Sequence, residues 1–213
     1  MLYEKSKLVF SIIELLLLTM LMVIVPSIIS IDAVVIGGGI PENSATEYVQ
    51  EVLILFSSIL FGIGALRYPE SRGFFVLVAG LFGCMFIREL DAYLDAVTHG
   101  FWLYPTLLLA FGSILYSIRC RGNVTAPMAE YTETKSFVYV AIGILIVLVF
   151  SRIFGTGHLW REVMGSHYHS SYKAIIQEGL ELVGYALIFF GSAMFFLQKV
   201  KAEKESVENE EIR

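Results

Sequence analysis

Charged residues are scarce in this sequence of 213 residues, where Asp, Glu, Lys and Arg together make up 16%. Soluble domains average about 25% charged residues. Hydrophobic residues make up 56% of the chain, and the mean hydropathy is +0.71. A soluble protein of this size cannot bury such an apolar excess, so these side chains must face lipid. The composition therefore predicts an integral membrane protein with the lipid bilayer as its main partner.

Cysteine is almost absent. Cys84 and Cys120 are the two cysteines, they lie far apart, and neither belongs to a CxxC motif. We therefore expect no disulfide and no thiol redox chemistry. Basic patches with interleaved aromatic residues are also missing, so we expect no nucleic-acid binding. The metal-ligand motifs HExxH, ExxH and DxxH do not occur either.

Long apolar runs are what the sequence does contain. Six segments reach the length of about 17 to 25 residues that a membrane-spanning helix needs, and they are residues 8–28, 48–66, 74–96, 101–117, 137–155 and 174–198. Short polar stretches with Gly or Pro separate them. We therefore predict an all-α fold, a polytopic integral membrane protein with a six-transmembrane-helix bundle formed by residues 1–198. Residues 199–213 are predicted to form a charged, solvated tail.

Lys and Arg are distributed unequally between the predicted loops. If the N-terminus lies inside, eleven of them are on the cytoplasmic side and three, Arg152, Arg161 and Lys173, are on the outer side. Cytoplasmic loops of membrane proteins are enriched in Lys and Arg. We therefore predict that the N- and C-termini are both cytoplasmic, in a multi-pass protein of a plasma membrane or a bacterial inner membrane.

Four ionisable residues share one face of the third predicted helix. At ~100° per residue, Arg88, Asp91, Asp95 and His99 form a single stripe, whereas Glu89 points elsewhere. A charged group at membrane depth costs at least ~2.5 kcal/mol, so such groups normally face the interior of the bundle and are paired. The stripe is therefore predicted to face other helices.

A second polar stripe lies on the sixth predicted helix, where Glu178, Glu181 and Tyr185 share a face. Since the third and sixth helices run in opposite directions, both stripes fall in the outer third of the bilayer. We predict that the stripes face each other, with Arg88 and Arg152 in structural ion pairs with the carboxylates. Carboxylates outnumber these two arginines, and the excess negative charge requires protons, a cation or water.

Histidines are predicted only on the outer side, and three of the four lie in the loop before the sixth helix. Imidazole and carboxylate groups are ligands that suit zinc, iron or manganese. The predicted ligands of such a divalent metal ion are Asp95, His99, Glu181, His158, His167 and His169. Asp91 and Glu178 are then the candidate catalytic bases.

Three functions fit this arrangement. The first is a divalent-metal-binding membrane enzyme, of hydrolase or oxidase type, that acts at the outer leaflet. The second is a protein that conducts protons or cations, or couples transport to them, through the same carboxylates. The third is a sensor or assembly subunit whose polar cluster is an ion-pair network that braces the bundle. Such a subunit would associate with another copy of itself or with another membrane protein.

Overall fold

The computed structural model describes residues 2–36, 44–120 and 123–211, and within these ranges the chain forms helices and turns but no strand. The helices are α1 (Leu2–Ser30), α2 (Ala45–Arg67), α3 (Arg72–Glu89), α4 (Asp91–Leu94), α5 (Leu103–Arg119), α6 (Thr125–Thr132), α7 (Lys135–Leu145), α8 (Ser151–Phe154), α9 (Gly157–Met164) and α10 (Ser170–Glu211). Two π-helical segments, Ile31–Ile36 and Ile146–Phe150, extend α1 and join α7 to α8. Two 3-10 turns, Pro69–Ser71 and Gly165–His167, precede α3 and follow α9.

Five helical stretches are long and apolar enough to cross a membrane. They are Leu8–Val34, Ala45–Arg67, Pro69–Glu89, Lys135–Phe154 and Ser170–Asn209. About 20 apolar residues in a helix match the ~30 Å thickness of the hydrocarbon core. The prediction of an all-α protein with several spans is confirmed. Leu103–Arg119 is a shorter apolar helix of 17 residues.

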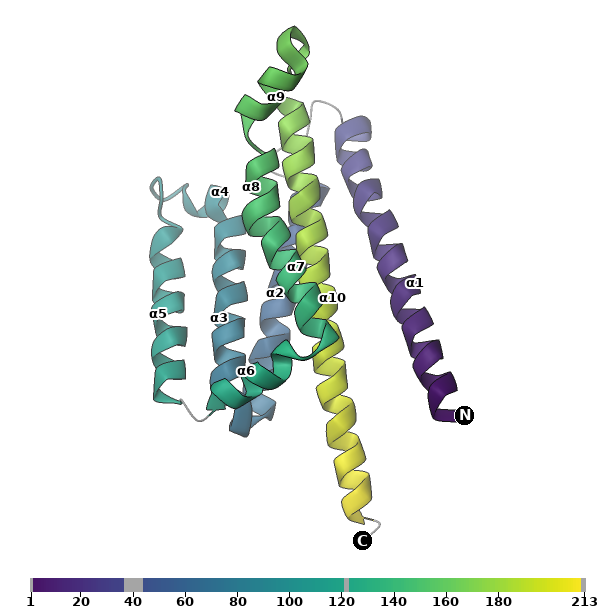
Figure 1. The fold of residues 1–213 in the computed structure, drawn as a ribbon. Coiled ribbons are helices and arrows are strands. Elements are labelled where there is room, and N and C mark those ends of the chain that lie inside the picture. Colours follow the sequence, from purple (N-terminus) through teal and green to yellow (C-terminus); the bar gives the residue numbers. More distant parts are fainter. Residues whose placement is uncertain (1, 37–43, 121–122, 212–213) are drawn as a thin grey trace.

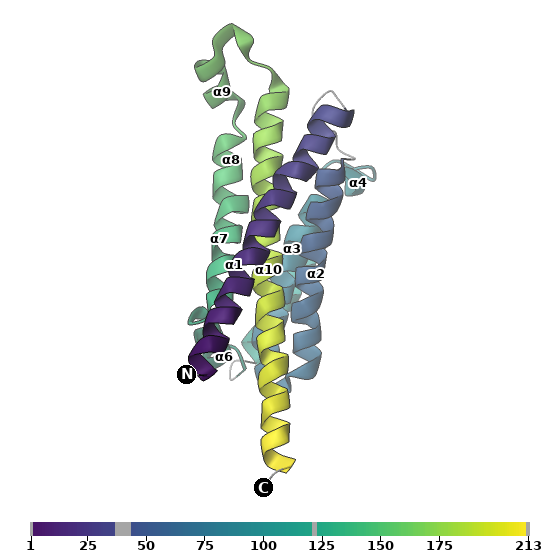
Figure 2. The ribbon, with the colours of Figure 1, turned by 90° about the vertical axis from the view of Figure 1, so that its right-hand side faces the viewer.

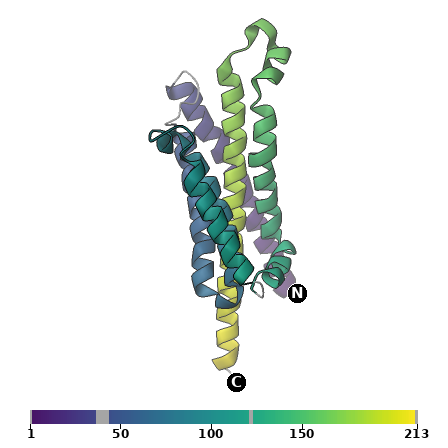
Figure 3. The same ribbon diagram turned by 90° about the vertical axis from the view of Figure 1, so that its left-hand side faces the viewer.

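The long helix α10 is the centre of the bundle and contacts α1, α2, α7, α8 and α9. On one side of it, α2, α3 and α5 follow each other as a layer of neighbours (Figures 1 and 3). On the other side α7 and α8 run along it, and α1 crosses it obliquely (Figure 2). The start of α1 and the end of α10 lie at one end of the bundle, and α9 lies at the other (Figure 1). We call these the terminal end and the α9 end.

An aromatic cluster fills the half of the bundle near the terminal end. Its rings come from α2, α3, α6 and α10, and the closest pair, Tyr131 and Phe195, has ring centroids 4.6 Å apart. Edge-to-face pairs of this kind add to the gain from burying the rings. The cluster consists of Phe61, Phe74, Phe75, Phe82, Tyr131 and Phe195. It leaves this half of the core apolar.

Two buried carboxylates attach α1 to the bundle. Near the α9 end, the fully buried Asp32 accepts hydrogen bonds from the backbone N–H groups of Ala45 (3.1 Å) and Thr46 (2.7 Å). These donors belong to the first turn of α2 and have no partner within that helix, so Asp32 satisfies them. Nearer the terminal end, Glu14 accepts hydrogen bonds from the Lys135 ammonium and the Tyr139 hydroxyl of α7.

One predicted boundary is wrong. The third segment was predicted to continue to residue 96, but α3 ends at Glu89. Beyond it the polar run turns back on itself, and the Asp95 carboxylate accepts a hydrogen bond from the backbone N–H of Gly100, a side-chain bond that competes with helix formation. Residues 199–211, predicted as a charged, solvated tail, are helical as the continuation of α10, with the Lys201–Glu205 pair at 3.7 Å. Part of the polar stretch predicted between the first two segments, residues 37–43, lies outside the described residues.

Helices α7 and α10 approach each other closely at glycine. A Cβ atom on Gly143 would lie 2.5 Å from the carbonyl oxygen of Gly184, and a Cβ on Gly191 would lie 2.7 Å from the carbonyl oxygen of Ser136. Contacts this short are open only to glycine, so small residues set the distance between the two helices.

The glycine contact gives a matched test. We expect Gly143→Ala to lower the free energy of unfolding by about 1–3 kcal/mol, because α7 must move away from α10. Gly112→Ala is the control, since a Cβ there meets nothing within 4 Å. Alanine favours a helix over glycine, so this control is expected to leave stability unchanged or slightly increased. Thermal unfolding of the purified protein in detergent measures both, and equal effects would contradict the assignment.

Candidate functional site

A polar pocket lies between the helices near the α9 end of the bundle. Its volume is about 270 Å³. Helices α2, α3, α4, α8 and α10 all contribute to its wall. The lining residues are Glu47, Glu51, Arg88, Glu89, Asp91, Ala92, Tyr93, Arg152, Gln177, Glu178 and Glu181. Six of these are carboxylates and two are arginines, so the pocket carries an excess of formal negative charge.

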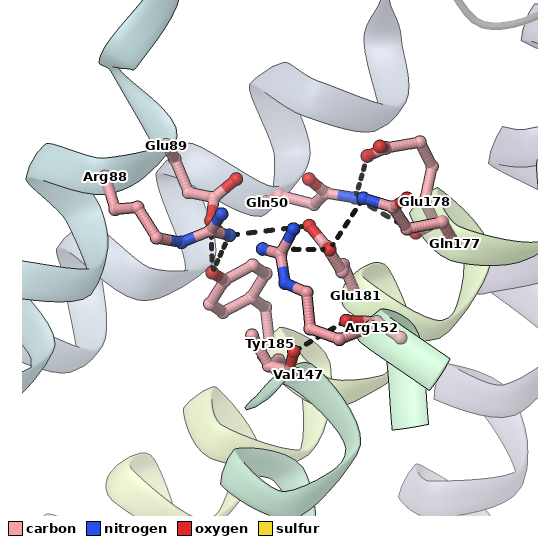
Figure 4. Close-up of polar contacts among 10 residues, drawn as sticks. Gln50, Arg88, Glu89, Val147, Arg152, Gln177, Glu178, Glu181 and Tyr185 are labelled. Carbon is pink, nitrogen blue, oxygen red and sulfur yellow. Dashed lines mark hydrogen bonds and ion pairs between the residues drawn. The ribbon is translucent and has the colours of Figure 1, made fainter. Parts of the chain in front are cut away.

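Glu181 is the centre of the ion-pair network in this pocket. Its side chain is 3% exposed, and the guanidinium groups of Arg88 and Arg152 lie 3.5 Å and 3.3 Å from its two oxygens (Figure 4). The three residues come from α10, α3 and α8. A buried carboxylate is tolerated when it is paired in this way, and removing one partner is costly. The network therefore joins three helices through one side chain.

Glu89 belongs to the same network. It forms an ion pair with Arg88 and accepts a hydrogen bond from the hydroxyl of the fully buried Tyr185 (Figure 4). Arg88 also lies 3.4 Å from the Tyr185 oxygen. The prediction that Glu89 points away from the polar stripe is wrong. Because α3 ends at Glu89, the side chains of its last turn are close to the pocket even when they are about 100° apart on the helix.

Gln50 of α2 and Glu178 of α10 join the two helices, and Glu178 also lines the pocket. The Gln50 amide nitrogen donates to the carbonyl oxygen of Glu178 at 3.0 Å and to its carboxylate at 3.3 Å. Next to them, the Gln177 amide donates to Glu181 at 3.2 Å. The Gln50 side-chain oxygen is buried and has no hydrogen-bond partner. Buried polar atoms normally have a partner, so this acceptor requires an explanation.

Tyr93 stands at the rim of the pocket, outside the long helices. A hydrogen bond with Tyr48 raises the pKa of the Tyr93 phenol to about 12. The phenol is therefore neutral at physiological pH and adds no negative charge to the pocket.

The two predicted catalytic residues, Asp91 and Glu178, both line the pocket. Asp91 is exposed. Of the predicted metal ligands, only Glu181 lines it. Asp95 and His99 lie in the turn after α4, where they pair with each other at 3.1 Å and where the His99 side chain is fully exposed. The end of α3 at Glu89 separates them from the stripe in which they were predicted.

The three histidines of the loop before α10 are exposed. His158 is on α9, His167 ends the following turn, and the His169 ring accepts or donates a hydrogen bond with Ser171 at 2.9 Å. This α9 segment lies at the end of the bundle (Figure 1), and the residues that line the pocket come from α2, α3, α4, α8 and α10. Across residues 2–36, 44–120 and 123–211, no three or more His, Cys, Asp or Glu side chains are arranged to hold a metal ion. The predicted zinc, iron or manganese site is therefore not supported.

Sequence reasoning missed Gln50, Glu89 and Gln177. Gln50 had a usable signal, because an amide in an apolar segment needs a partner inside the bundle. The chain matches no known family model, and no curated protein or solved structure is significantly similar to it.

The central position of Glu181 is testable. We expect Glu181→Ala to lower the free energy of unfolding by about 3 kcal/mol, since it leaves two guanidinium groups without this partner. Glu208→Ala, an exposed position on the extension of α10, is expected to change it by less than about 0.5 kcal/mol. Chemical or thermal unfolding in detergent compares the two variants. A loss no larger for Glu181→Ala than for Glu208→Ala would rule out the bracing role.

Proposed function

We propose that the chain crosses the membrane six times, with α5 as the sixth span. This helix has 17 residues and packs along α3. At 1.5 Å per residue its length is about 26 Å, close to the thickness of the hydrocarbon core. An even number of spans agrees with the position of both ends of the chain at one end of the bundle (Figure 1).

The distribution of basic residues supports placing the terminal end in the cytoplasm. Eleven Lys and Arg belong to that end or to loops that open toward it, against Arg152, Arg161 and Lys173 at the α9 end. Arg121 and Arg213 of these eleven lie outside the described residues. Because basic residues are enriched in cytoplasmic loops, the carboxylate pocket then opens to the outer side.

The orientation has a direct test. In a variant with Cys84 and Cys120 replaced by serine, a cysteine at Ser166 is expected to react with a membrane-impermeant maleimide in intact cells. A cysteine at Thr125 is expected to react only after the membrane is permeabilised. Both positions are exposed in the structure, so accessibility to the reagent is matched. The opposite labelling pattern would place the pocket on the cytoplasmic side.

We further propose that the pocket binds a cation from the outer side, as part of proton-linked or cation-linked transport or sensing. The observation that carries this proposal is the charge of the pocket, six carboxylates against two arginines. The arginines contact Glu89 and Glu181, and the carboxylate of Glu178 is bonded to the Gln50 amide. Uncompensated charge at membrane depth is costly, so we expect a proton or a cation that enters the pocket to offset the excess.

Two other functions are less well supported. A metal-dependent enzyme needs the histidines near the carboxylates, and His99, His158, His167 and His169 are exposed outside the pocket. A purely structural brace is favoured by the network of Arg88, Arg152 and Glu181, which connects three helices. The brace accounts for these residues but not for the excess of carboxylates.

If the pocket binds a cation, the melting temperature of the protein should depend on which cation is present. Among chloride salts of inorganic and organic cations at equal ionic strength, at least one is expected to raise the melting temperature of the detergent-purified protein. Glu178→Gln is expected to reduce that increase by at least half, since it removes a negative charge while preserving the shape of the side chain. Glu208→Gln is the control, because it removes the same charge far from the pocket. If no cation has an effect that depends on Glu178, the cluster is a brace only.

A further inference from the structure

Resting on the proposed cation binding, we propose that the ligand is a small organic cation whose ammonium or guanidinium group carries N–H donors. The pocket would distinguish such a molecule from an alkali or divalent metal ion, and from a quaternary ammonium ion of the same charge. Three observations support this choice of ligand class: the size of the pocket, the orphan acceptor of Gln50, and the way in which the protein's own guanidinium groups are held.

The pocket is too large for a single ion. Its volume of about 270 Å³ compares with roughly 30 Å³ for one water molecule, and it approaches the lower limit of about 300 Å³ for pockets that hold small molecules. The carboxylates are spread over the wall, and among the residues that the structure describes none form a compact group able to hold a metal ion. A molecule of several non-hydrogen atoms fits this spacing better than a bare ion.

The side-chain oxygen of Gln50 marks the position of a missing donor. Gln50 is 1% exposed, its nitrogen is used by Glu178, and its oxygen has no partner. In Figure 4 that oxygen points away from Glu178, toward the side on which Glu89 lies. The nitrogen of the same amide is bonded to Glu178, which lines the pocket, so this acceptor lies next to the wall of the pocket. An entering N–H group that is also positively charged would satisfy the acceptor and offset the negative charge.

The protein's own side chains already show what the pocket accepts. Arg88 and Arg152 both place guanidinium N–H groups against the carboxylate of Glu181, and Arg88 also contacts Glu89. Carboxylate, amide and hydroxyl oxygens are all hydrogen-bond acceptors, and the wall of the pocket offers mainly these. A ligand with the same donor chemistry finds Glu178 as an acceptor in the wall of the pocket and Gln50 as the unsatisfied acceptor next to it.

The test compares probes of equal charge that differ in donors. Thermal shift and calorimetric titration of the full-length protein in detergent would use ethylammonium, methylguanidinium, tetramethylammonium, sodium and calcium as chlorides at constant ionic strength and pH 7.4. Ethylammonium and methylguanidinium are expected to bind and to raise the melting temperature. Tetramethylammonium, sodium and calcium are expected to have at least tenfold weaker effects, because they lack N–H donors.

A glutamine variant tests the contribution of Gln50. Gln50→Met keeps the length of the side chain but removes both the free acceptor and the amide donor to Glu178, so methylguanidinium affinity is expected to fall at least tenfold. Gln198→Met, an exposed glutamine nearer the terminal end of α10, is the control and is expected to bind like the wild type. If Gln50→Met does not fold, the comparison of probes on the wild type decides alone.

The outcomes separate the two proposals. Equal binding of tetramethylammonium and ethylammonium would overturn the donor requirement while leaving cation binding intact. Equal or tighter binding of sodium or calcium would show that the site is an inorganic ion site, which also overturns the inference and keeps the broader proposal. If no probe binds in a manner that depends on Glu178, both proposals fail.

Discussion

A carboxylate inside an apolar helix bundle must be paired with positive charge, and the arrangement of helices at the α9 end depends on how Glu181 meets this requirement. Two arginines, from α3 and α8, contact it, and its own side chain on α10 is only 3% exposed. This explains how α8 and α3, which packs mainly on α2 and α5, are both linked to α10 at this level. The polar pocket is the space that remains around these pairs, so the brace and the candidate binding site use the same residues.

Much of the architecture was predictable, because every helix that crosses a lipid bilayer must be apolar over about 20 residues. The segment predicted at residues 48–66 is α2, Ala45–Arg67, and the other long apolar runs likewise became helices. The meeting of Arg88 with Glu181 followed from the same physics, since a charge excluded from lipid turns toward the interior. Helical periodicity and the cost of burying charge therefore anticipated which helix faces form the pocket.

The remaining features depend on where helices end and how turns are bonded, which helical periodicity does not predict. An ideal helix continued through residues 90–99 places Asp95 and His99 beside Asp91, but the chain leaves the helix at Leu90 and Asp95 bonds the backbone of Gly100. The same break brings Glu89 into the network, where an uninterrupted helix would turn it away. The histidines were assigned to the pocket on residue type and side of the membrane alone. The distance of the three loop histidines from the pocket depends on the path of the α9 segment, which no pattern in the sequence constrains.

The unbroken length of α10 has a mechanical consequence. Its 42 residues form a helix about 63 Å long, roughly twice the thickness of the hydrocarbon core. It carries Glu181 in one half and, near the other extremity, Glu203, which is joined to Arg67 at 2.7 Å. No loop lies between these two residues to absorb a displacement. The helix therefore acts as a rod, and a displacement at Glu181 would be passed along it to the junction with α2 at the opposite end of the bundle.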